Sequence, residues 1–240
     1  MKILTIYLLI SSRLWKRFDL MIDFKRLTIV LGHYGCGKTN LSLNIALDLA
    51  ARGKRVTIAD LDVVNPYFRT GDYKELLQAK GIKVVAPVFV STNLDNPSLP
   101  ASMDSIFENR DDYVVVDVGG DDAGAYALGR YAKKINAHPD KDIFYVVNKF
   151  RSLTSTPSEC AEILYEIENA ARIKATAVVN NSHLQHLTTK EDILSSMNFA
   201  RQTADILKLP LAFTTAKSEI FSELNSERLY KVEQIVKPPF

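Results

Sequence analysis

Cysteine is scarce in this sequence of 240 residues, which contains only Cys36 and Cys160. Two cysteines cannot build the disulfide framework of a small secreted protein, nor do they supply the ligands of a structural zinc site. Cys36 also lies in a glycine-rich loop, where a disulfide would obstruct a ligand. We therefore predict a reducing, cytoplasmic environment.

The sequence also lacks an excess of charge and a long apolar run. Its 30 basic and 28 acidic residues give a formal charge of +2, so we expect no nucleic-acid partner. The largely apolar run at residues 3–10 is shorter than the roughly 20 residues of a membrane span, and no small-residue cleavage site follows it. Trp15 and Phe18 could anchor an amphipathic segment on a membrane or a partner. We instead expect residues 1–20 to be a poorly ordered extension before a domain that begins near Met21.

Residues 21–240 contain no internal repeat and no Gly/Ser-rich linker, which favours a single domain. Short Val/Ile-rich runs alternate there with segments of helical period. This alternation predicts an α/β fold, a doubly wound and mostly parallel sheet with helices on both faces. The expected strands are 27–31, 55–60, 82–86, 113–118, 142–147, 175–180 and 211–214, and the expected helices are 38–51, 72–80, 101–109, 123–137, 157–171, 189–206 and 217–235.

The stretch "GHYGCGKT" at residues 32–39 fits the phosphate-loop pattern G-x-x-x-x-G-K-[ST] and follows an expected buried strand. Glycines let backbone N–H groups converge on phosphate oxygens, and the following helix adds its positive N-terminal end. Lys38 would reach the β and γ phosphates, and the Thr39 hydroxyl would bind Mg²⁺. The predicted phosphate-binding residues of this loop are Gly32, His33, Gly35, Cys36, Gly37, Lys38, Thr39 and Asn40.

Acidic and glycine residues also lie at the ends of two later strands, 55–60 and 113–118. Asp117 and the pair Gly119–Gly120 end the run "YVVVDVGG"; we expect Asp117 at the magnesium shell and the glycines at a γ phosphate. Asp60 and Asp62 are two residues apart, so both face one side if the strand continues. We predict Asp60 beside Mg²⁺ and Asp62 as the residue that orients an attacking nucleophile.

Together, "GHYGCGKT", "DLDVVNPYF" and "VVVDVGGDD" resemble the MinD/ParA-type branch of P-loop ATPases, which also includes the amidotransferases of cobyrinate synthesis. The resemblance implies Mg-ATP binding, a sheet of seven or eight strands and, in many members, a nucleotide-dependent sandwich dimer. It also implies an adenine contact from Asn180 or Asn181. Asn148 with Lys149 is a competing base reader, but "NKFR" lacks the aspartate of a guanine-specific N-K-x-D motif, so we expect ATP rather than GTP.

One departure from this family concerns the loop itself. The partitioning members carry a second lysine that reaches the phosphates of the other subunit, and His33 stands at that position here. A histidine is largely neutral near pH 7 and cannot replace a permanent charge. The departure predicts slow ATP turnover unless Arg69, Arg130, Arg151 or a partner supplies a cation.

Two classes of function remain open on these residues. The first is a nucleotide-driven switch, in which residues 60–70 and 119–127 move and change affinity for an unknown protein partner or a second copy. The second is a transferase or ligase related to cobyrinate or dethiobiotin synthetases. Such an enzyme needs a substrate pocket beside the γ phosphate, which the loop 86–100 could build.

Overall fold

The structure, a computed structural model, describes residues 22–62, 70–87, 102–224 and 228–236. The predicted extension 1–20, Arg69, and most of the two segments 60–70 and 86–100 lie outside these ranges, as does the expected start of the domain at Met21.

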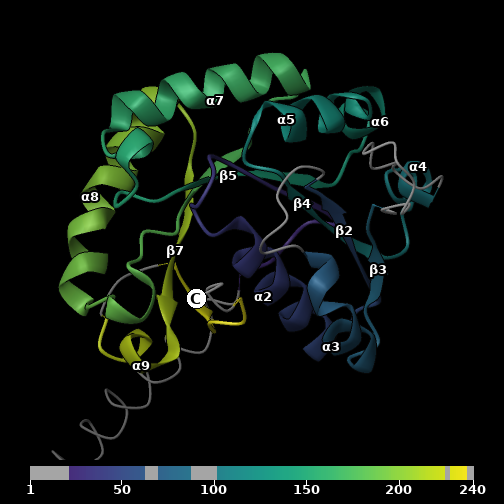
Figure 1. Cartoon of the computed structure of the whole chain (residues 1–240), viewed down its shortest axis with the longest axis horizontal. Coiled ribbons are helices and arrows are strands. Elements are labelled where there is room, and N and C mark those ends of the chain that lie inside the picture. The colour runs from purple at the N-terminus through teal and green to yellow at the C-terminus, as the bar shows by residue number, and fades with distance from the viewer. Residues whose placement is uncertain (1–21, 63–69, 88–101, 225–227, 237–240) are drawn as a thin grey trace, which may run out of the picture.

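Eight strands form one sheet in which every pair is parallel (Figure 1). Their spatial order is β3-β2-β4-β1-β5-β6-β7-β8. This arrangement confirms the predicted α/β fold, with an eighth strand beyond the seven expected runs. The strands are β1 Leu27–Leu31, β2 Val56–Leu61, β3 Lys83–Val85, β4 Tyr113–Val118, β5 Lys141–Val147, β6 Ala177–Asn180, β7 Leu211–Lys217 and β8 Leu229–Val232.

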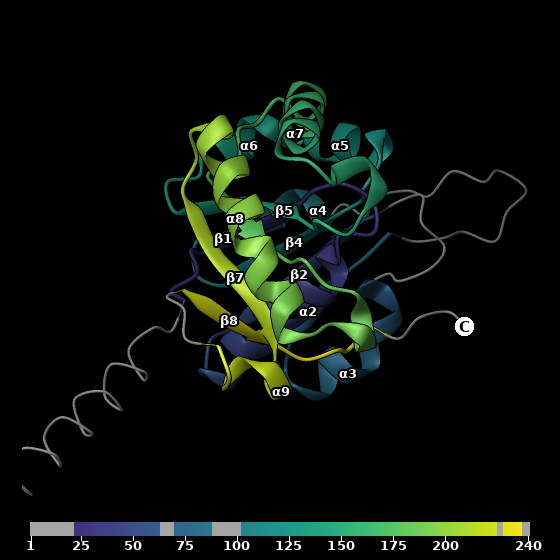
Figure 2. The same cartoon turned by 90° about the vertical axis from the view of Figure 1, so that its left-hand side faces the viewer.

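Helices cover both faces of the sheet (Figures 1 and 2). Side chains of α4, α5, α7 and α8 join one core cluster, and side chains of α2 and α3 join a second cluster on the opposite face. The helices are α2 Lys38–Ala51, α3 Lys74–Ala79, α4 Ser102–Ile106, α5 Asp122–Gly129, α6 Ala132–Asn136, α7 Pro157–Ala171, α8 Lys190–Leu207 and α9 Ser218–Phe221, with single 3₁₀ turns at Thr70–Tyr73, Ser152–Thr154 and Gln185–Leu187.

Both faces of the central strands are buried, which explains their nearly continuous apolar sequence. Alternate residues of each strand point to opposite faces. In β4, Val116 and Val118 therefore join the core under α5 and α7, whereas Val115 joins the core under α2. Asp117 falls on the α2 face, and this period places it beside the phosphate loop.

The predicted helix at 217–235 is wrong. Among the residues that the structure describes there, only Ser218–Phe221 is helical, and Leu229–Val232 forms β8, which pairs in parallel with β7. The Tyr230 ring packs against Phe24 and Phe213, with ring centroids 5.4 Å and 5.1 Å apart. Tertiary packing and an available strand edge thus outweigh the helical period of the segment. The predicted helix at 123–137 is also divided, into α5 and α6.

Candidate functional site

The glycine-rich loop joins β1 to α2, and its last residue shows why glycine is required. Gly37 is the N-cap of α2 with φ 88°, a conformation that side chains disfavour. A Cβ at Gly37 would lie 2.5 Å from Asn181 Nδ2 and 2.8 Å from His183 Nε2. The loop is therefore packed tightly against the end of β6, with its backbone at the start of a 14-residue helix.

Lys38 is nearly buried and folds over the loop that precedes it. Its Nζ donates a hydrogen bond to the carbonyl oxygen of His33 at 3.1 Å. The turn after β4 closes over the same point, because a Cβ at Gly120 would lie 2.7 Å from Lys38 Nζ and 2.6 Å from the Cα of Tyr34. The structure thus brings Lys38 and Gly120 together, as expected of groups that share one phosphate.

Asp60 and Asp117 are direct neighbours on β2 and β4, in register and on the same face of the sheet. Both are buried. Asp117 accepts hydrogen bonds from Ser42 Oγ at 3.3 Å and Thr70 Oγ1 at 2.9 Å. Burial raises the pKa of Asp117 to about 6, against the opposing effects of a Thr39 hydrogen bond and the charge of Lys38. A cation bound here would favour the ionised carboxylate.

The oxygen donors of Thr39, Asp60 and Asp117 fit a magnesium ion. In the described ranges, no group of three or more His, Cys, Asp or Glu side chains could hold a metal. Mg²⁺ does not need such a cage, because it keeps several waters and uses one or two carboxylates together with substrate phosphates. A hydroxyl beside two neighbouring carboxylates, at the foot of a phosphate loop, meets that requirement.

Asp62 lies two residues beyond Asp60, and its backbone N–H donates to Asp60 Oδ1 at 2.9 Å. Its carboxylate faces the turn after β4, since a Cβ at Gly119 would lie 3.3 Å from Asp62 Oδ1. Asp62 and Gly119 therefore meet beside the loop.

The two candidate base-contacting asparagines point in different directions. Asn181 Nδ2 donates to the carbonyl oxygen of Cys36 at 2.7 Å, so its side chain lies against the loop. Asn180 Nδ2 donates to Ser196 Oγ at 2.9 Å and to Thr214 Oγ1 at 3.3 Å, which places it toward α8. The structure brings only Asn181 to the candidate site.

Asn148, the competing base-contacting residue, uses its side chain to bind neighbouring backbone groups. Its Oδ1 accepts from the backbone N–H of Phe150 at 3.0 Å and of His183 at 3.3 Å, and the side chain is fully buried. Lys149 reaches Ser195 on α8 instead. Neither residue lines the cavity described next.

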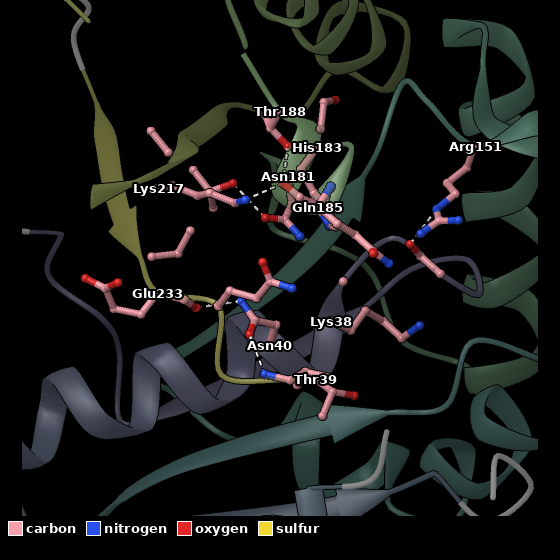
Figure 3. A pocket seen from close by; sticks show the side chains of 18 of the residues that line it. Lys38, Thr39, Asn40, Arg151, Asn181, His183, Gln185, Thr188, Lys217 and Glu233 are labelled. Carbon is pink, nitrogen blue, oxygen red and sulfur yellow. Dashed lines mark hydrogen bonds between the residues drawn. The ribbon is translucent and has the colours of Figure 1, made fainter. Parts of the chain in front are cut away.

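A cavity of about 680 Å³ runs from the loop across the ends of β6 and β7 to the segment after β8 (Figure 3). Lys38 and Arg151 lie toward one end, and Lys217 and Glu233 toward the other. The volume lies within the range of about 300–1,000 Å³ typical of small-molecule sites. The lining residues are Tyr34, Gly35, Gly37, Lys38, Thr39, Asn40, Asp62, Gly120, Arg151, Asn181, Ser182, His183, Gln185, Thr188, Ile193, Thr215, Ala216, Lys217, Val232, Glu233, Gln234 and Val236.

Comparison with known proteins decides the family of this chain. Residues 27–189 match the family described as the CobQ/CobB/MinD/ParA nucleotide binding domain. The chain belongs to this family. The match spans the phosphate loop, Asp60, Asp117 and the end of β6, and it confirms the resemblance read from the three motifs.

Solved structures similar to the chain share its fold at low sequence identity. FtsY from Mycoplasma mycoides has a TM-score of 0.54 at 18% identity and covers 81% of this chain and 62% of its own. FtsY from Thermotoga maritima has a TM-score of 0.53 at 21% identity, with 79% and 61% covered. The 54 kDa signal recognition particle protein of Aeropyrum pernix K1, solved with GDP, has a TM-score of 0.51 at 15% identity, with 82% and 42% covered. The chain thus spans about two fifths to three fifths of these proteins' lengths.

No curated protein sequence matches this member of the CobQ/CobB/MinD/ParA family. Within the ranges that the structure describes, no helix is long and apolar enough to cross a membrane.

The arginines named as sources of a cation differ in position within this family member. Arg151 Nε donates to the carbonyl oxygen of Gly35 at 2.7 Å, and a Cβ at Gly35 would lie 3.3 Å from Arg151 Cζ. Its guanidinium is thus held on the phosphate loop of its own chain. Arg130 is exposed at the end of α5 and does not line the cavity. His33, at the position where partitioning members carry a second lysine, faces the carbonyl oxygen of Tyr34 through Nδ1 at 3.1 Å.

Two titratable groups near the loop are shifted toward their neutral forms. Burial raises the pKa of Cys36, so this thiol fills space in the loop rather than forming a reactive thiolate. Burial and the charges of Arg151 and Lys217 lower the pKa of His183 to about 4, so His183 is neutral near pH 7. Its Nδ1 accepts from the backbone N–H of Gln185 at 3.2 Å, and Nε2 therefore faces Gly37 as the protonated nitrogen.

Several cavity residues do not follow from the sequence patterns. Gln185 and Thr188 come shortly after "NNSH" at the end of β6, where the strand-end rule could have found them. Thr215 and Lys217 end β7, whose predicted bounds stopped at residue 214. Residues 232–235 gave no signal because they fell in the predicted helix 217–235, and Val236 follows it directly.

Proposed function

We propose that this chain binds Mg-ATP, hydrolyses it slowly and acts as a nucleotide-dependent switch. The observation that carries the proposal is the cavity, which begins at Lys38 and Thr39 and extends over the ends of β6 and β7 to Gln234. One end has the backbone and cation of a phosphate site, and the remaining length suits a nucleoside.

The choice of ATP over GTP rests on the stretch "NKFR", which lacks the aspartate of a guanine-specific motif, and on the amides that line the described cavity. Guanine-specific sites use a carboxylate to accept from the base. The described lining contains two carboxylates: Asp62 lies beside the phosphate loop, and Glu233, toward the far end, accepts from Ser218 Oγ through Oε1. The amides of Gln185 and Gln234 also line the cavity. An amide can accept a hydrogen bond from the adenine amino group and donate one to the adenine N1.

In the proposed reaction a water oxygen attacks the γ phosphorus, and the bond between that phosphorus and the β–γ bridging oxygen breaks. Asp62 orients the water, while Lys38 and the N–H groups of Gly119 and Gly120 bind the γ oxygens. Thr39, Asp60 and Asp117 would hold Mg²⁺, which offsets charge on the phosphates.

Slow turnover is part of the proposal, because His33 replaces the lysine that other members use across a dimer. Arg151 offers a permanent charge within the same chain, and its Nε already lies on the loop at Gly35. A guanidinium increases the rate most when it contacts the transferred phosphoryl group. In Arg151 one donor, Nε, is already occupied by the carbonyl oxygen of Gly35, so we expect turnover to stay slow.

The proposed switch acts on a second copy of the chain or on a protein partner. Exposed apolar side chains occur in the phosphate loop, on α5, which follows β4, and after β5 and β6. Such residues are suited to a surface that is covered in one nucleotide state. They are Tyr34, Tyr126, Leu153, Leu184 and Leu187.

Asp62→Ala is the variant that tests the switch. We expect the wild-type chain to release phosphate slowly from Mg-ATP, and Asp62→Ala to release at least about tenfold less because its water is not oriented. ATP then persists in the site, so the mass measured by size exclusion with light scattering should rise with ATP for Asp62→Ala. Asp205→Ala, at an exposed carboxylate of α8, is the matched control and should behave as wild type.

The contrary result is tight ATP binding with neither phosphate release nor a change in mass. That outcome would end the switch proposal and favour transfer of the phosphoryl group to an acceptor carboxylate, as in the synthetases of this family.

A further inference from the structure

The chain after β8 is held against the phosphate-loop helix by two asparagine side chains. Asn40 and Asn44 lie one turn apart on α2 and therefore share a face. Both Nδ2 groups donate to the carbonyl oxygen of Glu233, at 3.0 Å and 2.9 Å. Asn44 Oδ1 accepts from the N–H of Glu233 at 2.8 Å, and Asn40 Oδ1 accepts from those of Ile235 and Val236 at 2.9 Å and 3.1 Å.

We name residues 232–236 the strap. The five hydrogen bonds from Asn40 and Asn44 hold the strap in the way that a neighbouring strand holds a strand of a sheet. β8 ends at Val232, and the backbone groups beyond it have left the sheet ladder. An amide side chain both donates and accepts, so each asparagine can satisfy a peptide group on both sides. The strap thereby keeps one position although its residues 233–236 have no regular secondary structure.

The strap is also a wall of the cavity. Val232, Glu233, Gln234 and Val236 line the same space as Lys38 (Figure 3). Asn40 follows Thr39 directly, so the phosphate-binding turn and the strap are joined through one residue.

The chemistry of the strap suits a flat heterocycle rather than a phosphate. Val232 and Val236 supply apolar surface, and Ile193 and Ala216 supply more from α8 and β7. The amide of Gln234 adds a donor and an acceptor between them. Lys38 and Arg151, which would hold a phosphate, lie at the other end of the cavity (Figure 3), whereas Lys217 on the strap side donates from Nζ to the carbonyl oxygen of Gln185.

We infer that the strap 232–236 is the wall against which the nucleotide base binds, and that Asn40 and Asn44 are positioning residues that hold it there. This inference rests on the proposed nucleotide binding at the phosphate loop. It assigns selection of the base to a segment near the end of the chain, outside residues 27–189 that match the family.

The variant Asn44→Ala distinguishes binding of the base from binding of the phosphates. The experiment measures calorimetric affinity of the full chain for Mg-ATP and for Mg-tripolyphosphate, which has no base. Loss of two strap hydrogen bonds should weaken Mg-ATP binding by about tenfold, while Mg-tripolyphosphate affinity stays within about twofold. Asn136→Ala is the matched control, because Asn136 Nδ2 also donates to a backbone carbonyl, of Arg172 at 3.1 Å, but outside the cavity.

Two further variants keep the test independent of folding. Asn40→Asp keeps the oxygen that accepts from Ile235 and Val236, so it should lose less ATP affinity than Asn40→Ala. Gln234→Ala leaves every strap hydrogen bond in place and should still weaken ATP about threefold or more, with tripolyphosphate unchanged.

The inference is overturned if Asn44→Ala and Gln234→Ala leave ATP affinity unchanged, or if both ligands weaken equally. It is also overturned if Asn136→Ala weakens ATP as much as Asn44→Ala does. A different result defeats the proposed function instead: Lys38→Ala with undiminished affinity for both ligands would place them outside the phosphate loop.

Discussion

Replacing Lys38 by alanine should weaken Mg-ATP binding by about tenfold to a few hundredfold. A hydrogen bond to a charged group contributes about 1.5–3 kcal/mol, and each 1.4 kcal/mol corresponds to about tenfold in affinity. Lys38 Nζ has a carbonyl oxygen of the loop as its partner at 3.1 Å, so the ammonium is already held above the loop where phosphates would bind. Calorimetric titration of both proteins with Mg-ATP measures the difference.

A matched lysine shows whether this loss belongs to the site. Lys149→Ala removes an ammonium that reaches Ser195 on α8 and does not line the cavity. It should bind Mg-ATP as the wild-type chain does. Equal affinity of Lys38→Ala and wild type would contradict the assignment of the loop as the phosphate site.

Gly120→Ala should lower phosphate release by about 10² while leaving Mg-ADP affinity nearly unchanged. An added Cβ would lie 2.6 Å from the Cα and 2.7 Å from the N of Tyr34, and this backbone cannot move aside as a flexible side chain would. The turn after β4 must therefore withdraw from the loop, and its N–H groups leave the γ phosphate. Loss of one such donor costs about 10²–10³ in rate in other enzymes.

Gly81→Ala is the control for a general loss of stability. Gly81 has φ 75°, so alanine is strained there, but a Cβ would meet no atom within 4 Å. It should lower the melting temperature with little change in the rate of the folded protein. If Gly120→Ala hydrolyses ATP at the wild-type rate, the turn at 119–120 is not part of the reaction.

The central sheet could be predicted because its strands are short, apolar and bounded by polar residues at one end. β1, β4 and β5 are each recovered within about a residue, since burial on both faces leaves a run such as "YVVVDV". β8 could not be predicted. Its four residues are fixed by the edge of β7 and by the aromatic side chains Phe24 and Phe213, which are distant in the sequence.

The site likewise has residues that the sequence predicts and residues that it does not. The phosphate loop follows from a local pattern, because β1, the loop and α2 are contiguous, and Asp117 follows from its place at the end of the apolar run of β4. The choice between Asn180 and Asn181 required knowing which side chains of β6 face α2. Residues 177 and 179 face α2, and alternate residues share a face, so Asn181 reaches the loop and Asn180 does not. The strap depends on contacts between positions separated by 189 to 196 residues, which no local pattern carries.

The most direct test of the account is a titration of the purified chain with Mg-ATP and, separately, with Mg-GTP. We predict one site per chain and tighter binding of ATP, because "NKFR" lacks the aspartate of a guanine-specific motif and the amides of Gln185 and Gln234 line the described cavity. Failure to bind either nucleotide, or tighter binding of GTP, would contradict it.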